Sequence, residues 1–299
     1  MPDSIIRSLR VDVPLRLGQT MRLLELGSGD TAARFTDDHV RAAFRAITGP
    51  VSFRLDAASG QVDLEAWGPG ASWLADHAAA FIGLTDDPDA LEPRHEVVRQ
   101  RHLRSKGLRI AASGAVYDSV VHWVVHQKVT GKGAARSMRD LVRVHGEPAP
   151  GPLGLRLGPA PEVVAGLGYE DFHPLGIERK RAEVLRNVAR RVSRLEEIIE
   201  MSPAEASSRL QAFPGVGPWT AASVVGTVLG DPDAVQVGDY HIPNSVAWAL
   251  AGEPRGTDER MLELLEPYRS QRRRVVLLLK GIHAPRYGAR SEVRDIRGV

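Results

Sequence analysis

The chain contains no cysteine, which excludes disulfide bonds, thiolate zinc sites and iron–sulfur clusters held by cysteine. It also lacks an apolar run long enough to span a membrane and an N-terminal stretch typical of a signal peptide. At 299 residues, of which 43% are hydrophobic, it is long enough for two domains and a substantial core. We therefore expect a cytoplasmic protein without a membrane-embedded part.

Positive charge is concentrated in the second part of the chain. The formal net charge is only +2, but residues 1–90 hold 8 Lys and Arg against 13 Asp and Glu, so the remainder carries the basic surplus. Clustered Lys and Arg can follow nucleic-acid phosphates, although any one cluster can equally be a solvated helix face. The basic clusters are Arg99–Arg109, Lys128–Arg143, Arg179–Arg181 and Arg272–Arg274.

The N-terminal region has the two-residue periodicity of half-buried strands. Such alternation occurs at 11–17, 40–46, 51–55 and 62–66, with a turn at Ala58–Gly60. Residues 39–48 also fit a helix, and 73–81 fit a helix packed on the sheet. We predict an α+β protein that is mainly α: an antiparallel-sheet domain at 1–105, followed by an all-helical domain at 106–299.

A glycine hairpin between two helices is the most informative segment. Ser202, Pro203 and Glu205 form a capping box with proline at the first helical position, and the helix ends before Pro214. Gly215 and Gly217 permit a tight turn, and a second helix then completes the unit at 203–230. Unpaired amides at a helix start attract anions. On turn chemistry alone, an ordinary turn between two core helices remains an equal alternative.

The wider segment resembles the helix-hairpin-helix DNA glycosylase superfamily. The hairpin Leu210–Ala221 reads LQAFPGVGPWTA and is followed by Gly238-Asp239-Tyr240, similar to the family's hairpin and its essential aspartate. Residues 114–127 and 175–182 resemble the family's first helix and the segment before the hairpin. The chain looks most like the bacterial 3-methyladenine DNA glycosylase II (AlkA-like) type, and the absence of cysteine argues against the iron–sulfur branch.

This resemblance implies the chemistry of base excision. Asp239 would stabilise the positive sugar that forms as the bond from an alkylated purine to C1′ breaks, and would direct the attacking water. Strand-cutting relatives carry a nucleophilic lysine where this chain has Trp219, so monofunctional hydrolysis to an abasic site is expected. The residues expected to line the pocket of the flipped base are Trp219, Tyr240, Gln127 and Trp123.

The resemblance also implies how DNA is held. The expected DNA contacts are Gly215, Val216, Gly217, Thr220 and Lys128. A structural Na⁺ or K⁺ is expected at the backbone carbonyls of Gln211, Phe213 and Val216, with no other cofactor. Relatives usually place an apolar wedge where this chain has Lys128, which leaves open which residue fills the gap beside the flipped base. His122 and His126 have helical two-histidine spacing but lack a third ligand, which argues against zinc.

The sequence leaves other interpretations of substrate and function open. The lesion can be of the 8-oxoguanine type, a mismatch or a bulky alkyl adduct instead of 3-methyladenine. A non-catalytic DNA-binding protein with the same hairpin is the other alternative, in which Asp239 only caps a helix. In either case we expect a monomer whose partner is double-stranded DNA, with damaged bases in the case of an enzyme.

Overall fold

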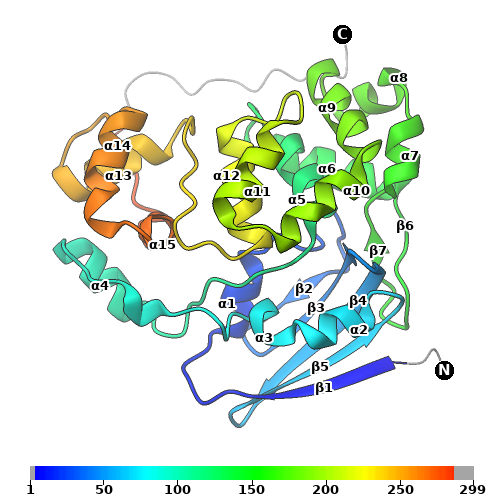
Figure 1. Ribbon diagram of the computed structural model, residues 1–299, viewed down its shortest axis with the longest axis horizontal. Helices are drawn as coiled ribbons and strands as arrows, with labels where there is room; N and C mark the ends of the chain where they lie inside the picture. Colours follow the sequence, from blue (N-terminus) through cyan, green and yellow to red (C-terminus); the bar gives the residue numbers. More distant parts are fainter. Residues whose placement is uncertain (1–3, 286–299) are drawn as a thin grey trace.

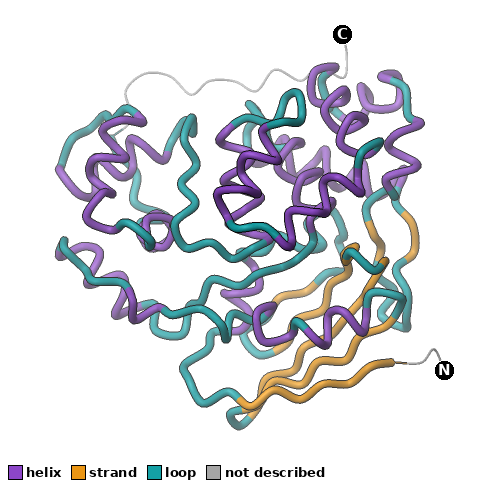
Figure 2. The backbone as a smooth tube through the Cα atoms, viewed as in Figure 1, coloured by secondary structure: helices purple, strands orange, loops and turns teal. Residues whose placement is uncertain are grey.

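A computed structural model describes residues 4–285, so the last part of the predicted helical domain, 286–299, lies outside the described residues. Figure 1 shows a twisted sheet at one end of the molecule and helices over the rest. The tube in Figure 2 separates the strand-rich end from the helix-rich remainder. The predicted class, α+β and mainly helical with an N-terminal antiparallel sheet, is confirmed.

The main sheet is antiparallel, with strand order β1-β5-β4-β3-β2. Its strands are β1 (Ser4–Arg10), β2 (Arg34–Phe35), β3 (His39–Ala46), β4 (Gly49–Ala58) and β5 (Gln61–Trp67). The turn between β4 and β5 has positive φ at both Ser59 (49°) and Gly60 (78°), as a two-residue hairpin of type I′ requires. The predicted turn and the last two predicted strands are therefore confirmed, and the segment at 39–48 is a strand and not a helix.

Three short helices cover this sheet: α1 (Leu17–Arg22), α2 (Ala71–Asp76) and α3 (Ala78–Phe81). The rings of Phe44, Phe53 and Phe81 meet in the core between them, with centroids 5.1–6.1 Å apart. The prediction of a strand at 11–17 is wrong, since the first strand ends at Arg10 and α1 begins at Leu17. The predicted helix at 73–81 is present but interrupted where one helix ends and the next begins.

The rest of the described chain is helical apart from a small two-stranded ribbon. The helices are α4 (Glu96–Arg104), α5 (Val116–Val125), α6 (Gly131–His145), α7 (Pro161–Gly166), α8 (Tyr169–Phe172), α9 (Arg179–Ala189), α10 (Val192–Glu196), α11 (Pro203–Gln211), α12 (Pro218–Val228), α13 (Ile242–Ala251), α14 (Asp258–Leu265) and α15 (Arg272–Leu278). The ribbon pairs β6 (Glu147–Pro148) with β7 (Arg156–Leu157). Helix α5 is almost wholly buried and packs against α9, α10 and α12.

Helix α4 packs on the last helices of the chain. Val98 is fully buried in a cluster with Met261, Leu265 and Val275, and Figure 1 shows α4 beneath α13, α14 and α15. The predicted domain boundary between residues 105 and 106 stays a prediction. Helix α4 precedes this boundary but packs in one core with helices that follow it. Within residues 4–285, no helix is long and apolar enough to cross a membrane.

Candidate active site

The hairpin is built as the sequence predicts. The Ser202 hydroxyl accepts a hydrogen bond from the Glu205 amide at 3.4 Å, and a Glu205 carboxylate oxygen accepts one from the Ser202 amide at 3.0 Å. These two bonds fix the start of α11. Gly215 has φ +87°, and a Cβ there would lie 2.2 Å from Val184 of α9. Gly217 caps α12 at φ −94° and faces open space. Gly215 therefore closes the turn, while a side chain at Gly217 would point into open space.

Gln127 connects the end of α5 to this hairpin. Its amide nitrogen donates to the Gly215 carbonyl at 3.1 Å and to the Thr220 hydroxyl at 2.8 Å. Thr220 is only 2% exposed, so its side chain supports the hairpin from within. The DNA contact predicted for Thr220 stays a prediction. Lys128 follows directly, exposed and with the unusual φ of +54°.

Asp239 lies against the start of α12 and the start of α13 together. Its Oδ2 accepts the indole Nε1–H of Trp219 at 2.9 Å. Its Oδ1 accepts the amides of His241 at 2.7 Å and Ile242 at 2.8 Å. One carboxylate oxygen thus caps α13, while the other accepts a hydrogen bond from Trp219 of the hairpin. The side chain is half-buried, so the carboxylate is both fixed in place and open to a ligand.

The predicted pocket aromatics separate into two groups. Trp123 and Trp219 meet edge to face, with centroids 5.6 Å apart and planes at 82°. The Trp123 indole also donates to Thr227 of α12 at 3.4 Å. Tyr240 is 82% exposed and contacts the ring of His241, so it does not line an enclosed pocket. The two tryptophans therefore form the aromatic wall beside Asp239.

The carbonyls predicted to bind a cation lie in the turn after α11. The Phe213 oxygen accepts the Val216 amide at 3.0 Å, which leaves it one further lone pair. Carbonyl oxygens at the end of a helix such as α11 have no intrahelical partner, which suits a hard cation. The three-carbonyl site at Gln211, Phe213 and Val216 stays a prediction. In residues 4–285, no three His, Cys, Asp or Glu side chains cluster as a metal site would require.

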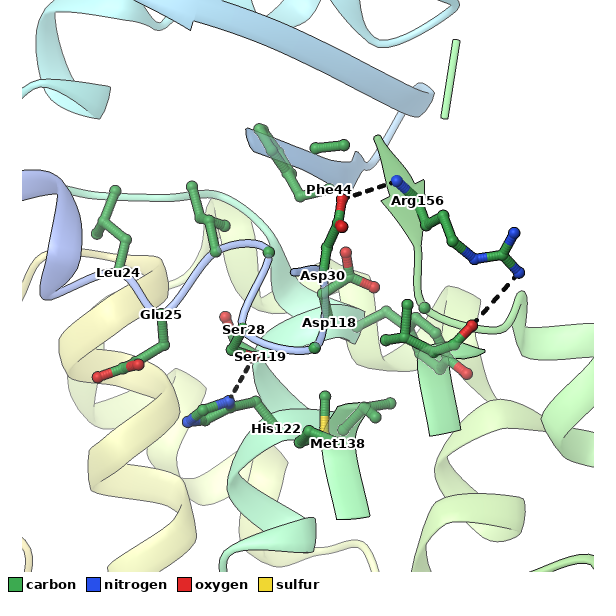
Figure 3. A pocket seen from close by; sticks show the side chains of 18 of the residues that line it. Leu24, Glu25, Ser28, Asp30, Phe44, Asp118, Ser119, His122, Met138 and Arg156 are labelled. Atoms are coloured by element: carbon green, nitrogen blue, oxygen red, sulfur yellow. Dashed lines mark hydrogen bonds between the residues drawn. The ribbon is translucent and has the colours of Figure 1, made fainter. Parts of the chain in front are cut away.

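A loop at residues 24–30, between α1 and β2, was not singled out by the sequence. It borders a cavity of about 40 Å³ against α5, where the Ser28 hydroxyl and His122 Nδ1 lie 2.9 Å apart (Figure 3). His122 is 5% exposed and its ring stacks on His126 at 4.1 Å. Burial, together with His126, lowers the pKa of His122 well below its ordinary value. Trp123 also lines this cavity, which therefore adjoins the aromatic wall.

The basic cluster Arg272–Arg274 does not form a free phosphate-binding strip. Arg272 binds both carboxylate oxygens of Asp233, at 2.9 and 2.5 Å. Arg274 pairs with Asp86, and each side chain of this pair is 5% exposed. These two arginines hold α15 in place. Their partners are distant in sequence, so no local pattern revealed the pairing.

No protein-family model matches the chain, but individual relatives do. A Bacillus subtilis protein with the provisional name DNA-3-methyladenine glycosylase YfjP is 25% identical over 171 residues. The match covers 55% of this chain and 58% of that protein, so the chain spans little more than half the length of this curated relative.

Solved structures match over more of the chain. A 3-methyladenine DNA-glycosylase from Archaeoglobus fulgidus has a TM-score of 0.73 at 20% identity, over 91% of this chain and 96% of that one. A Clostridium acetobutylicum 8-oxoguanine glycosylase/lyase in complex with double-stranded DNA has a TM-score of 0.63 at 14% identity, over 80% and 83%. The chain therefore has the fold of DNA glycosylases. The comparisons confirm the resemblance to the helix-hairpin-helix group, and the sequence match supports its 3-methyladenine type.

Proposed function

We propose that this protein is a DNA glycosylase that hydrolyses the N-glycosidic bond of a flipped-out alkylated purine. The observation that carries the proposal is the contact between Asp239 and Trp219 directly beside the hairpin. It brings a fixed carboxylate to the first turn of α12, where amides without an intrahelical partner would bind a DNA phosphate. A fixed carboxylate beside a phosphate anchor supports base excision at this site.

Asp239 supplies the charge that the reaction needs. Departure of the base leaves positive charge on the sugar, and a fixed carboxylate stabilises it without reorganising during the reaction. Each carboxylate oxygen can accept more than one hydrogen bond. Among residues 4–285, the Trp219 indole is the single donor to Oδ2, so this oxygen retains capacity to orient a water molecule. Water is then the nucleophile, and the product is an abasic site.

Trp219 also restricts the reaction type. A tryptophan has no nucleophile with which to form a Schiff base, so the proposed enzyme leaves the DNA backbone intact. Together with Trp123 it offers two ring faces of different orientation. Aromatic faces attract cationic bases such as N-alkylated purines, and those bases leave without a strong general acid. This supports alkylated purines as the substrate class.

DNA binding would centre on the hairpin. The amides at Gly217 and the start of α12 would hold one phosphate, and Lys128 would add a contact next to Gln127. A monovalent cation at the carbonyls of Gln211, Phe213 and Val216 would add positive charge to the same turn. Double-stranded DNA with a damaged base is the proposed partner.

Release of 3-methyladenine and 7-methylguanine from alkylated duplex DNA tests the proposal. The wild type should release them without strand breaks before alkali treatment. Asp239→Asn should lose excision but keep DNA binding and stability, because asparagine caps helices about as well as aspartate. Equal excision by both proteins would overturn the role of Asp239. Binding without any excision by the wild type would instead favour a non-catalytic DNA-binding protein.

A further inference from the structure

Asp258, in the first turn of α14, is bonded to the residue that precedes Asp239. Its Oδ2 accepts a hydrogen bond from the Gly238 amide at 3.0 Å, across twenty residues of chain. Gly238 has φ +88°, and an added Cβ there would meet no non-neighbouring atom of residues 4–285 within 4 Å. This glycine therefore serves the conformation of the backbone. Since glycine is also the most freely rotating residue, the bond to Asp258 restrains the chain where Asp239 begins.

The helix that carries Asp258 does not use its carboxylate as a cap. Thr257 caps α14, and its hydroxyl accepts a hydrogen bond from the Arg260 amide at 3.2 Å. Within residues 4–285, Oδ1 of Asp258 is buried and has no hydrogen-bond partner. A negative charge favours the start of a helix, but an exposed carboxylate would supply that charge without burying an unpaired oxygen. The bond to Gly238 accounts for the position of this side chain.

The residue after Asp239 is bonded to the same region through Asn244 of α13. Nδ2 of Asn244 donates to the Tyr240 carbonyl at 3.3 Å. Oδ1 of Asn244 accepts a hydrogen bond from the Gly256 amide at 3.1 Å, in the segment that leads into α14. Asp239 therefore lies between two residues whose backbone groups are both held.

The start of α14 gives these bonds a fixed support. A Cβ at Gly256 would lie 2.7 Å from Cβ of Ala247 and 2.7 Å from the Pro243 carbonyl oxygen, so this segment lies directly on α13. Met261 and Leu265 of α14 are fully buried, and α14 packs along α13 (Figure 1). Movement of the bonded groups would therefore require movement of a packed helix.

We propose that Asp258 and Asn244 are positioning residues for Asp239. Their bonds set the place of the Asp239 backbone, whereas Trp219 and the first amides of α13 set the direction of its carboxylate. The inference rests on the proposed glycosylase function. A displacement of about 1 Å at a reacting group can slow a reaction by about 100-fold, so the position of this backbone matters for the rate.

Single-turnover excision of 7-methylguanine measures the effect on the rate. Asp258→Ala removes the acceptor for the Gly238 amide and should slow excision by about tenfold to 100-fold. Asp258→Asn keeps an oxygen that can accept this bond, so it should excise within about threefold of the wild-type rate. Asn244→Ala removes the other two bonds and should also slow excision, which provides a second test that does not alter α14.

Binding of two modified duplexes distinguishes a misplaced carboxylate from a general loss of structure. A pyrrolidine in place of the damaged nucleotide carries a positive charge, as the sugar does when the base departs, whereas a tetrahydrofuran is neutral. Asp258→Ala should bind the pyrrolidine duplex about tenfold more weakly and the tetrahydrofuran duplex as tightly as the wild type does. Fluorescence anisotropy measures both affinities.

Thr257→Ala is the matched control for stability. It removes the cap of α14 and should lower the melting temperature, but it leaves the bond from Gly238 to Asp258 in place, so excision should change less than about threefold. Wild-type excision by Asp258→Ala would overturn the inference, as would equal slowing by Thr257→Ala or equal weakening with both duplexes. A wild type that excises no alkylated purine would instead overturn the proposed function, and this inference with it.

Discussion

The indole Nε1 of Trp219 donates to Oδ2 of Asp239 over 2.9 Å, across twenty residues of chain. The other oxygen of the same carboxylate caps α13 through two amides. Two helices therefore hold Asp239: α12, the second helix of the hairpin, through Trp219, and α13 through the amides at its start. A group held in this way needs no reorganisation when charge develops beside it.

Replacing Trp219 by phenylalanine tests the value of this contact. Trp219→Phe keeps a ring against Trp123 but removes the donor to Asp239. One hydrogen bond to a charged group is worth about 1.5–3 kcal/mol, so we expect single-turnover excision to slow by roughly 10-fold to 150-fold. DNA affinity, measured by fluorescence anisotropy with an undamaged duplex, should stay the same.

Asp239→Ala is the comparison variant, because it removes the carboxylate and with it both contacts. Asp239→Ala should also cost about 1 kcal/mol of stability through loss of the α13 cap, whereas Trp219→Phe leaves that cap intact. Thermal unfolding separates the two effects. An unchanged excision rate in Trp219→Phe would show that the indole contact plays no part in the chemistry.

We predict different effects for alanine at the two hairpin glycines: a loss of stability at one and weaker DNA binding at the other. At Gly215 an added Cβ meets Val184 at 2.2 Å and φ is +87°, so Gly215→Ala should destabilise the protein by several kcal/mol. At Gly217 an added Cβ would meet no non-neighbouring atom of residues 4–285 within 4 Å, and φ is −94°, so Gly217→Ala should leave stability nearly unchanged. Its methyl group would instead stand between the α12 amides and a phosphate, and weaken DNA binding roughly tenfold.

Thermal unfolding and DNA titration of both variants check this pair. Each variant is the control for the other, because both add one methyl group to the same turn. If Gly217→Ala binds DNA as tightly as the wild type, the hairpin does not contact a phosphate at this position.

Lys128 combines a strained backbone with a predicted DNA contact. It is exposed and has φ +54°, a conformation that costs a non-glycine residue about 1 kcal/mol. Lys128→Gly should therefore stabilise the protein by about that amount. It should also weaken DNA binding, and lower the slope of log affinity against log salt by about 0.9, because one phosphate contact is lost.

Lys132→Ala, at an exposed position in the first turn of α6, is the control for general loss of charge. It should change the salt slope less than Lys128→Gly does. A salt slope in Lys128→Gly that equals the wild-type slope would show that Lys128 does not contact the backbone of DNA.

Local pattern predicted the hairpin and its helices because the relevant contacts are local. The capping box spans four residues, and Gly215 and Gly217 define the turn between them. The prediction of a strand at 11–17 failed because it relied on local pattern alone. The alternating residues fit a strand, but the preceding segment forms the strand of the sheet, and α1 packs its apolar residues onto β3.

The contacts that the sequence could not predict are long-range. The pocket role of Gln127 stays a prediction, and the sequence did not reveal that its amide donates to Gly215 and Thr220, some ninety positions later. Arg272, Arg273 and Arg274 look alike in sequence, and only their partners in the fold distinguish them. The sequence allows Asp239 to be either a helix cap or a catalytic group, and the fold gives its two oxygens different partners.

Buried His122 and half-buried His126, whose rings stack, predict a loss of stability in mild acid. Burial lowers the pKa of both His122 and His126 in the folded protein. The unfolded chain, with an ordinary histidine pKa near 6.5, then binds more protons than the folded one. Stability should be fully present above about pH 6.5 and fall below it, by up to about 1.4 kcal/mol per pH unit for each histidine.

Denaturant unfolding between pH 5 and 8 measures this slope. His122→Asn removes one titrating ring and should flatten the curve below pH 6.5. Ser28→Ala is the control, because it breaks the 2.9 Å contact to Nδ1 but leaves the histidine buried, so it should keep the slope. An identical pH dependence in His122→Asn and the wild type would mean that His122 takes up its proton without cost to the fold, and that its cavity admits water freely.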